Sequence, residues 1–532
     1  MINLVPGVLI SYFAAAVVLA LPVSLIVLAW YRSSVLQRMR ERGSAGSGAP
    51  RVTKAVAGSV QSVPAALPAP RLHLRLVVVY TLGAIAASAV STSLYFDAFD
   101  LSFSALRAFM MGYALIWPIV PTLALLLTLS LRQSLLLALA YYLAGAAVVL
   151  LGSLVSAFAL GRPDVSPLGN VGDYTGFLAI EALTPLAVIA LTGGRKLRPV
   201  APLVLAGLLV FSFSALVLQS AILSLLDSAS LRGLVLAFPN ADVAWFMLAS
   251  LPVAYGCWLL LGALARAYAG KTFSDAQLVV DSWWLIAVFG TSVTLAGSRG
   301  WRGLLGLLSF VAYRIVVTAG LALWKAGGSA GARRLLMLRV FGFRRRTERL
   351  FDAVGERWRL TGSVQMIGGT DLAGRTLDPG DVVGFVGGHL REQFVSGSEQ
   401  LQQRLRGLDE ARDPDGRFRV NEFLCHDDTW QGTLEALLLR SEAVLMDLRG
   451  FTHVNSGCLY ELGRLAEHGK LERTLFVVDG TTDVELLRAT LLRAAADGGA
   501  PGAPAVHTAH TTGESGGELR RILGSLSALS AG

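Results

Sequence analysis

The sequence predicts a multipass α-helical membrane domain followed by a C-terminal α/β domain, and three observations support this prediction. The chain has 532 residues, more than one hydrophobic core usually supports. Hydrophobic residues make up 54% and charged residues 16%, whereas soluble domains usually carry about 25% charge. The charge is also unevenly spread, because residues 7–324 contain long uncharged runs and residues 333–532 have an ordinary soluble composition. We therefore expect a transmembrane domain over residues 1–325, a hinge over 326–334 and an α/β domain over 335–532.

The transmembrane prediction rests on the length of the apolar runs. A bilayer core about 30 Å thick requires about 20 apolar residues per spanning helix, and about nine runs approach that length. They are Val8–Trp30, Leu76–Phe96, Ala108–Ser130, Ser134–Leu160, Thr175–Thr192, Val200–Leu226, Val243–Ala265, Trp283–Gly297 and Gly303–Trp324. The eighth run is short, so it fits either a span or a re-entrant segment. The first run is too long for the core of a cleaved signal peptide and reads as a true helix.

The orientation follows from the positions of arginine and lysine, which are retained on the cytoplasmic side. Basic residues collect in the first loop and then in alternate loops, at Arg132, Arg195–Arg198 and Arg266–Lys271. One loop, with Arg299 and Arg302, departs from this pattern. We expect an N-terminus outside, a cytoplasmic C-terminal domain and a location in a bacterial-type inner (plasma) membrane. The first loop also contains residues 43–70, whose Gly, Ala, Ser and Pro content predicts a flexible cytoplasmic linker.

Two ionisable residues, Glu181 and Arg314, fall within the predicted spans, where charge is costly and often functional. An ion pair between these two side chains, or an Arg314 that reaches the membrane interface, would give them a structural role. A path for protons or solutes is the alternative.

The composition limits cofactors and partners. Three cysteines and seven histidines form neither a disulfide framework nor paired metal-ligand spacings, so we expect no metal and no bound cofactor. Cys425 and Cys458 are expected to be small buried hydrophobes. The net charge of +9 favours anionic lipid as the partner, with no nucleic acid, and a homo-oligomer is compatible with the sequence. A basic cluster next to the last span is expected to face lipid: Arg333, Arg334, Arg339, Arg344, Arg345, Arg346 and Arg349.

The C-terminal part alternates strand-like and helix-like segments. Predicted strands cover Leu335–Phe341, Ser363–Ile367, Arg419–Leu424, Ala443–Leu448 and Arg473–Val478. Predicted helices cover Arg346–Leu360, Asp381–Val395, Thr429–Arg440, Ser456–His468, Asp483–Ala495 and Gly517–Leu529. This alternation predicts right-handed βαβ units and a five-stranded parallel, flavodoxin-like sheet.

Ligands of such sheets bind beyond the carboxyl ends of the strands. Polar residues gather in the loops that leave the predicted strands: Arg344, Asp371, His426, Asp428, Arg449 and Asn455. We expect these side chains to share one rim. The alternative is that they are ordinary loop residues, with Asp428 capping the helix that follows.

The segment from Ala443 to Gly469 is the most informative for chemistry. Asp447 lies near the end of its strand, and Asn455-Ser456-Gly457 opens a helix that carries Glu461. The free N–H groups at such a helix start can bind an anion.

The pattern Ser456-Gly457-Cys458-Leu459-Tyr460-Glu461-Leu462-Gly463 resembles TIR domains and equally resembles nucleoside 2-deoxyribosyltransferases. Both families are flavodoxin-like, and their active members use this glutamate to break the N-glycosidic bond of NAD or of a nucleoside. The resemblance covers about thirty residues closely and the order of strands loosely. The usual TIR signature is absent from the first strand, LLMLRVFGF, and the insertion Ser396–Gly416 has no counterpart.

The resemblance implies a role for Glu461, while the chemistry of the reaction, the rule for strand ends and the helix start suggest roles for the other candidate site residues. Glu461 would be catalytic, stabilising or trapping an oxocarbenium-like sugar. Asp447 would orient a ribose hydroxyl, and Arg344 or Arg449 would bind phosphate. Asp371, His426, Asn455 and Ser456 complete the predicted ligand-binding set. The structural alternative for Glu461 is an exposed carboxylate favoured by the helix dipole.

We therefore expect a membrane-anchored protein whose TIR-like domain binds, and as an NAD(P) or nucleoside N-glycosidase hydrolyses, a nucleotide such as NAD. A transporter or channel with a regulatory cytoplasmic domain is one alternative. A non-enzymatic signalling or interaction module is the other.

Overall fold

The computed structural model describes residues 6–41, 69–159, 166–192, 197, 200–226, 241–324, 333–340, 344–368, 379–497, 506–511 and 516–530. The chain forms two compact units. The first contains residues 1–28, 70–325 and 378–383, and the second contains residues 29–69, 326–377 and 384–532. Residues 43–68 of the predicted linker (43–70) and residues 326–332 of the predicted hinge (326–334) lie outside the described residues.

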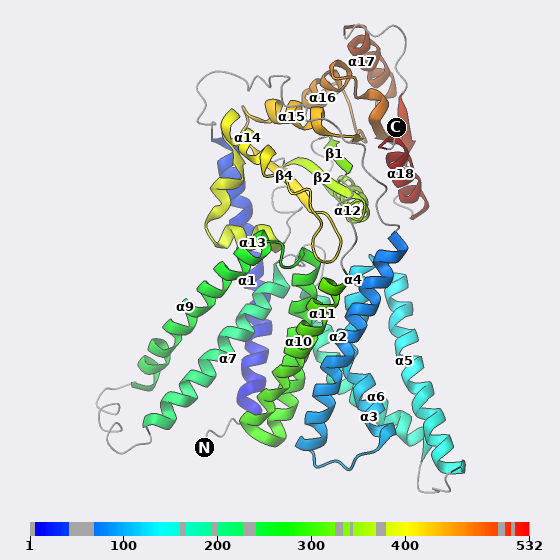
Figure 1. Ribbon diagram of the computed structural model, residues 1–532. Helices are drawn as coiled ribbons and strands as arrows, with labels where there is room; N and C mark the ends of the chain where they lie inside the picture. Colours follow the sequence, from blue (N-terminus) through cyan, green and yellow to red (C-terminus); the bar gives the residue numbers. More distant parts are fainter. Residues whose placement is uncertain are drawn as a thin grey trace. The chain divides into compact units, whose positions relative to one another are not determined.

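Apolar helices build the first unit, and each predicted run lies largely on one or two of them (Figure 1). They are α1 (Pro6–Arg40, whose last turns belong to the second unit), α2 (Ala69–Ala98), α3 (Ala105–Leu115), α4 (Ile119–Leu126), α5 (Leu131–Leu154) with the π-helical turn η2 (Val155–Ala159), α6 (Pro167–Thr192), α7 (Ala201–Leu226), α9 (Ala241–Ala269), α10 (Asp275–Arg299), the 3-10 helix η3 (Gly300–Leu307) and α11 (Leu308–Leu323).

Six helical segments in the described part are long and apolar enough to cross a bilayer. A seventh is obtained if α3 and α4, which are bent by 43° relative to each other, form one broken span. The eighth predicted run, which looked short in the sequence, lies in the 25-residue helix α10. The structure thus gives six to seven candidate membrane helices, while the count of about nine stays a prediction.

Large apolar side chains are exposed on several of these helices, which is the pattern of a surface that faces lipid. In the candidate span Ser250–Ala269 of α9, no residue of the most apolar stretch is buried. In the candidate span Leu131–Phe158, formed by α5 and η2, 11% of the residues of that stretch are buried. Leu131, Leu135 and Leu139 on α5 expose 78%, 62% and 52% of their surface. Extensive exposed apolar surface is rare on soluble proteins, so these helices indicate contact with a bilayer.

The predicted ion pair between Glu181 and Arg314 is wrong. On α6, Glu181 accepts hydrogen bonds from Tyr95 of α2 and from Thr291 of α10. On α11, Arg314 forms its ion pair with Asp281 of α10. Asp281 was not considered as the partner of Arg314 because the predicted run began at Trp283, whereas α10 begins at Asp275, six residues before Asp281. All of these polar groups thus have partners within the helical unit.

The second unit is an α/β domain with seven strands among its described residues. They are β1 (Arg333–Arg339), β2 (Gly362–Gly368), β3 (Phe394–Val395), β4 (Val420–Cys425), β5 (Ala443–Asp447), β6 (Thr474–Val478) and β7 (His507–His510). The order is β3-β4-β2-β1-β5-β6-β7, and every neighbouring pair is parallel. All five predicted strands are present, and β3 and β7 extend the sheet at its two edges. The order reverses at β1, which is the position where such sheets bind ligands.

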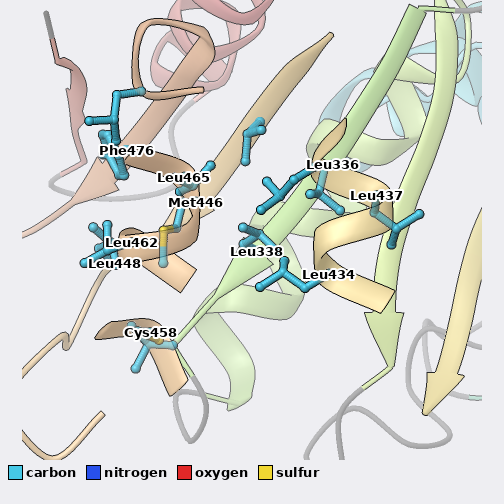
Figure 2. Close-up of a cluster of buried hydrophobic side chains, with 14 of the residues drawn as sticks. Leu336, Leu338, Leu434, Leu437, Met446, Leu448, Cys458, Leu462, Leu465 and Phe476 are labelled. Atoms are coloured by element: carbon cyan, nitrogen blue, oxygen red, sulfur yellow. The ribbon is translucent and has the colours of Figure 1, made fainter. Parts of the chain in front are cut away.

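Helices cover both faces of the sheet because the strands alternate their apolar side chains. Leu336 and Leu338 of β1 face the helices α14 (Ser398–Arg406), α15 (Trp430–Arg440), α16 (Ser456–Glu467) and α17 (Val484–Asp497). Figure 2 shows this core, with Leu434 of α15 and Leu462 of α16 among its labelled side chains. Leu335 and Met337 instead face α12 (Arg344–Trp358) and α18 (Gly516–Leu529). A sheet buried on both faces fixes the ends of its strands, and with them the residues at its edge.

The predicted helix Asp381–Val395 is wrong in its second half. The helix α13 (Pro379–Val386) is followed by the 3-10 helix η4 (His389–Gln393) and by β3. Gly388 lies between these helices with a φ of 85°, a left-handed conformation that glycine adopts without strain. The Gly387-Gly388 pair therefore ends the helix and turns the chain toward the sheet edge.

The basic cluster next to the last span does not face lipid as a whole. Arg333 donates to the Ser527 carbonyl and to Ser530, and Arg334 forms an ion pair with Glu410. Arg339 is 4% exposed at the end of β1. These three arginines belong to a strand of the sheet, where neighbouring elements supply their partners and cover their side chains. The side chains of Arg344, Arg345 and Arg346 lie outside the described part of the chain.

Candidate ligand site

A cavity of about 230 Å³ lies at the carboxyl ends of β1, β2 and β4 in the α/β domain. The carboxyl ends of parallel strands meet at one edge, so residues from separate strands line the same space. The lining residues are Met39, Met337, Leu338, Arg339, Phe351, Ile367, Gly368, Cys425, His426, Asp427, Trp430 and Glu461. This volume is below the roughly 300–1,000 Å³ of sites for drug-sized ligands, so the cavity fits a ligand of one or two rings or a part of a larger one.

Glu461 is the most unusual side chain of the cavity. It is 4% exposed on α16, and its Oε2 atom has no hydrogen-bond partner among the described residues. The burial raises the pKa of its carboxyl group to about 8, and the positive charge of Arg339 opposes part of this rise. The expectation of an exposed helix carboxylate is therefore wrong, because α16 packs its Glu461 face against the sheet. At neutral pH the group is mostly a neutral carboxylic acid.

His426 follows β4 directly and also lines the cavity. Its Nδ1 atom lies 2.7 Å from the Arg38 carbonyl oxygen, in the last turn of α1, and its Nε2 atom lies 3.4 Å from the Ser396 hydroxyl. The His426 backbone N–H donates to the Thr429 hydroxyl at 3.0 Å. Both ring nitrogens of His426 therefore have polar partners within the protein. The contact with the Arg38 carbonyl joins this wall of the cavity to the end of α1.

Several lining residues were not predicted as site residues from the sequence. Met39 comes from the end of α1, almost four hundred residues before Cys425 of β4 and more than four hundred before Glu461 of α16, and it is 2% exposed. Trp430 and Phe351 read as core residues of amphipathic helices. Arg339 had a usable signal, because it lies near the carboxyl end of the first predicted strand, Leu335–Phe341, where the ligand rule applies. Cys425 is buried as predicted, and burial raises the pKa of its thiol to about 11, so it stays protonated.

Asp447 and Arg449 pair with each other and lie outside the described cavity lining. The Arg449 side chain donates from Nε to Oδ1 and from Nη2 to Oδ2 of Asp447, both at 2.8 Å. Both residues are buried, at 1% and 4% exposed. The pair is a bidentate bond that closes the loop after β5 on itself, so these groups fix the loop that leads to α16.

Asn455 and Ser456 also lie outside the described lining, at the start of α16. The Asn455 side-chain oxygen accepts from the backbone N–H and from the hydroxyl of Thr452, which shapes the turn before the helix. Ser456 is the first helical residue and is exposed. Asp428 is exposed, and the residue at the N-cap of α15 is Thr429. Asp371 and the side chain of Arg344 lie outside the described residues.

The geometry thus brings together His426 and Glu461 from the predicted set and adds Arg339. Glu461, Arg339 and His426 line one cavity whose other walls include Met337, Phe351 and Trp430. Such a mixture of apolar walls and a few polar groups is typical of small-molecule sites. No group of side chains among the described residues could hold a metal ion.

The fold and the cavity define a class: a chain with six to seven candidate membrane helices and an all-parallel α/β domain with a ligand-sized cavity at the carboxyl edge of its sheet. Comparisons with protein-family models, curated proteins and solved structures found no match for the chain.

Proposed function

We propose that this membrane protein binds a nucleoside or nucleotide such as NAD in the cavity of its α/β domain, with Glu461 as the residue that acts on the ligand. The observation that supports the proposal is the burial of the Glu461 carboxyl group in a cavity at the carboxyl edge of a parallel sheet, where its Oε2 atom has no hydrogen-bond partner among the described residues. Burying a polar group without a partner is unfavourable, and proteins retain such groups mainly at functional sites.

Cleavage of an N-glycosidic bond is the reaction that these groups would support. As the bond of a nucleoside breaks, its electron pair would move into the ring of the leaving base, and the Glu461 hydroxyl would give its proton to a heteroatom at the edge of the base that it faces. Water would then add to the sugar carbon and return a proton to the Glu461 carboxylate. The positive charge of Arg339 would stabilise the carboxylate in between, since it already opposes the rise in pKa.

Purified full-length protein in detergent tests this proposal. We expect calorimetric binding of NAD or a nucleoside and release of the free base, measured by chromatography. Glu461→Ala should abolish this release. Glu467→Ala is the matched control, because Glu467 lies on the same helix with 51% of its side chain exposed, and its activity should equal that of the wild type. Intact NAD and nucleosides after long incubation, together with no calorimetric binding of any nucleotide, would contradict the proposal.

From the distribution of basic residues, we further propose that the N-terminus is outside and that the α/β domain is in the cytosol of a bacterial-type cell.

Transport is the alternative function of the membrane helices. A transport function predicts that the protein carries a solute across the membrane of proteoliposomes, and that Glu181→Gln or Arg314→Ala changes the rate of this flux. The internal partners of both side chains favour a structural role for them instead.

A further inference from the structure

The cavity of the α/β domain contains polar groups that differ in what they can offer a ligand. The His426 ring lies beside the Arg38 carbonyl and the Ser396 hydroxyl, within the protein. Asp427 is exposed. Glu461, in contrast, is buried and has a carboxyl oxygen with no hydrogen-bond partner in the described part of the protein. Arg339 also lines the cavity and acts on Glu461 through its positive charge. Glu461 is therefore the buried carboxyl group of the cavity that has a hydrogen bond left for a ligand to make.

The chemical form of Glu461 decides which ligand groups it can recognise. A neutral carboxylic acid presents an O–H donor and a carbonyl acceptor side by side in one plane, whereas a carboxylate presents acceptors alone. The burial that raises the pKa of Glu461 to about 8 keeps the neutral form dominant at pH 7. Its best partner is then a ligand edge with an acceptor next to a donor, since such an edge forms two parallel hydrogen bonds. Carboxamides, lactams and amidines have this edge.

The rest of the cavity suits the flat ring that carries such an edge. Phe351 and Trp430 supply aromatic surface, and Met39 and Met337 supply adaptable apolar surface. The volume of about 230 Å³ fits a ring-sized group.

We propose that Glu461 recognises the amide or amidine edge of a heterocyclic base, which binds in the cavity between the carboxyl ends of β1, β2 and β4. The inference rests on the proposed function and narrows its ligand to bases with adjacent donor and acceptor atoms.

Two nucleosides that differ at this edge test the inference on the full-length protein. Inosine has an N–H donor beside its carbonyl acceptor, and 1-methylinosine replaces that donor with a methyl group. We expect calorimetry at pH 7 to show inosine binding at least about tenfold more tightly, because an unpaired buried polar group costs about 1–3 kcal/mol.

Substitutions of Glu461 provide the second arm of the test. Glu461→Gln keeps a donor and an acceptor at the same positions, so inosine affinity should stay within about threefold of the wild type. Glu461→Leu has neither group and should lose the preference for inosine over 1-methylinosine. Raising the pH from 6 to 8 ionises about half of Glu461 and should weaken inosine binding to the wild type by about twofold. Glu461→Gln should bind inosine equally at both values, because glutamine does not ionise and inosine keeps most of its N–H protons at pH 8. Hydrogen exchange of β1 and β5 reports whether each variant is folded.

The outcomes separate this inference from the proposed function. Equal affinity for inosine and 1-methylinosine, or binding to Glu461→Gln as weak as to Glu461→Leu in folded protein, overturns the recognition of an amide edge and leaves nucleoside binding in place. No binding of any nucleoside or nucleotide to the wild-type protein overturns both.

Discussion

Protonation of Glu461, a residue of the ligand site, makes the stability of the α/β domain depend on pH. Its pKa is about 8 in the folded protein and near the ordinary value of 4.5 in the unfolded chain. Between these values the folded state binds one more proton than the unfolded state, so the free energy of unfolding falls as the pH rises. The Glu461 contribution to stability is therefore fully present below about pH 4.5 and is lost as the pH approaches and passes 8.

Replacing this carboxyl group should remove that pH dependence. We expect Glu461→Gln to be as stable as the wild type near pH 5 and more stable at pH 8, by several kcal/mol at most, since one pKa unit corresponds to about 1.4 kcal/mol. Hydrogen exchange of β1 and β5 in the full-length protein at the two pH values measures the difference. Glu467→Gln, an exposed residue of the same helix, is the control and should show no gain. Equal protection of wild type and Glu461→Gln at pH 8 would show that Glu461 is not buried as described.

At the scale of elements, the turn from α10 into η3 depends on a glycine. A Cβ atom at Gly303 would lie 2.1 Å from the Ala296 backbone nitrogen and 2.4 Å from its Cα atom. Backbone atoms cannot move aside as a flexible side chain can, so the chain can return this closely along α10 only because residue 303 has no side chain.

Gly303→Ala should therefore push η3 away from α10 and destabilise the helical unit by an amount comparable to other overpacking substitutions, about 1–3 kcal/mol or more. The thermal unfolding temperature in detergent, followed by hydrogen exchange of α10 and α11, measures the effect. Gly297→Ala provides the comparison, because a Cβ at Gly297 meets no atom within 4 Å. A Gly303→Ala protein that unfolds at the same temperature as Gly297→Ala would contradict this description of the turn.

The elements also show how far local sequence reasoning reaches. Four of the five predicted strands are short runs dominated by apolar residues, a local property, and the fifth, Arg419–Leu424, carries apolar residues in its second half. The edge strand β3 is two residues long, and β7 consists of His507, Thr508, Ala509 and His510, so neither has an apolar run to detect. Both form because an existing strand offers unpaired backbone groups at the edge of the sheet.

At the scale of the whole molecule, the orientation in the membrane stays a prediction from charge. We expect a green fluorescent protein fused after Gly532 to fluoresce in bacterial cells, because it folds in the cytosol. Alkaline phosphatase fused in the loop after Leu226 should be active, because that loop is predicted outside. An active phosphatase at the C-terminus, combined with an inactive one after Leu226, would contradict the predicted orientation and indicate the opposite one.

The two-part organisation, the apolar helices and the parallel α/β sheet were all predictable from the sequence alone. These features follow from the periodicity and length of apolar runs, which each segment carries in its own residues. The sequence also placed Glu461 and His426 among the candidate site residues, through the rule that ligands bind at the carboxyl ends of strands.

The contacts between side chains, in contrast, could not be predicted from the sequence and are known from the folded structure. It paired Arg314 with Asp281 instead of Glu181, joined Asp447 to Arg449, and brought Met39 to the cavity that Glu461 lines. It also buried Glu461, which turned an expected surface carboxylate into a neutral acid. Contacts, burial and pKa depend on packing between segments far apart in the chain, and no local pattern of residues records that packing.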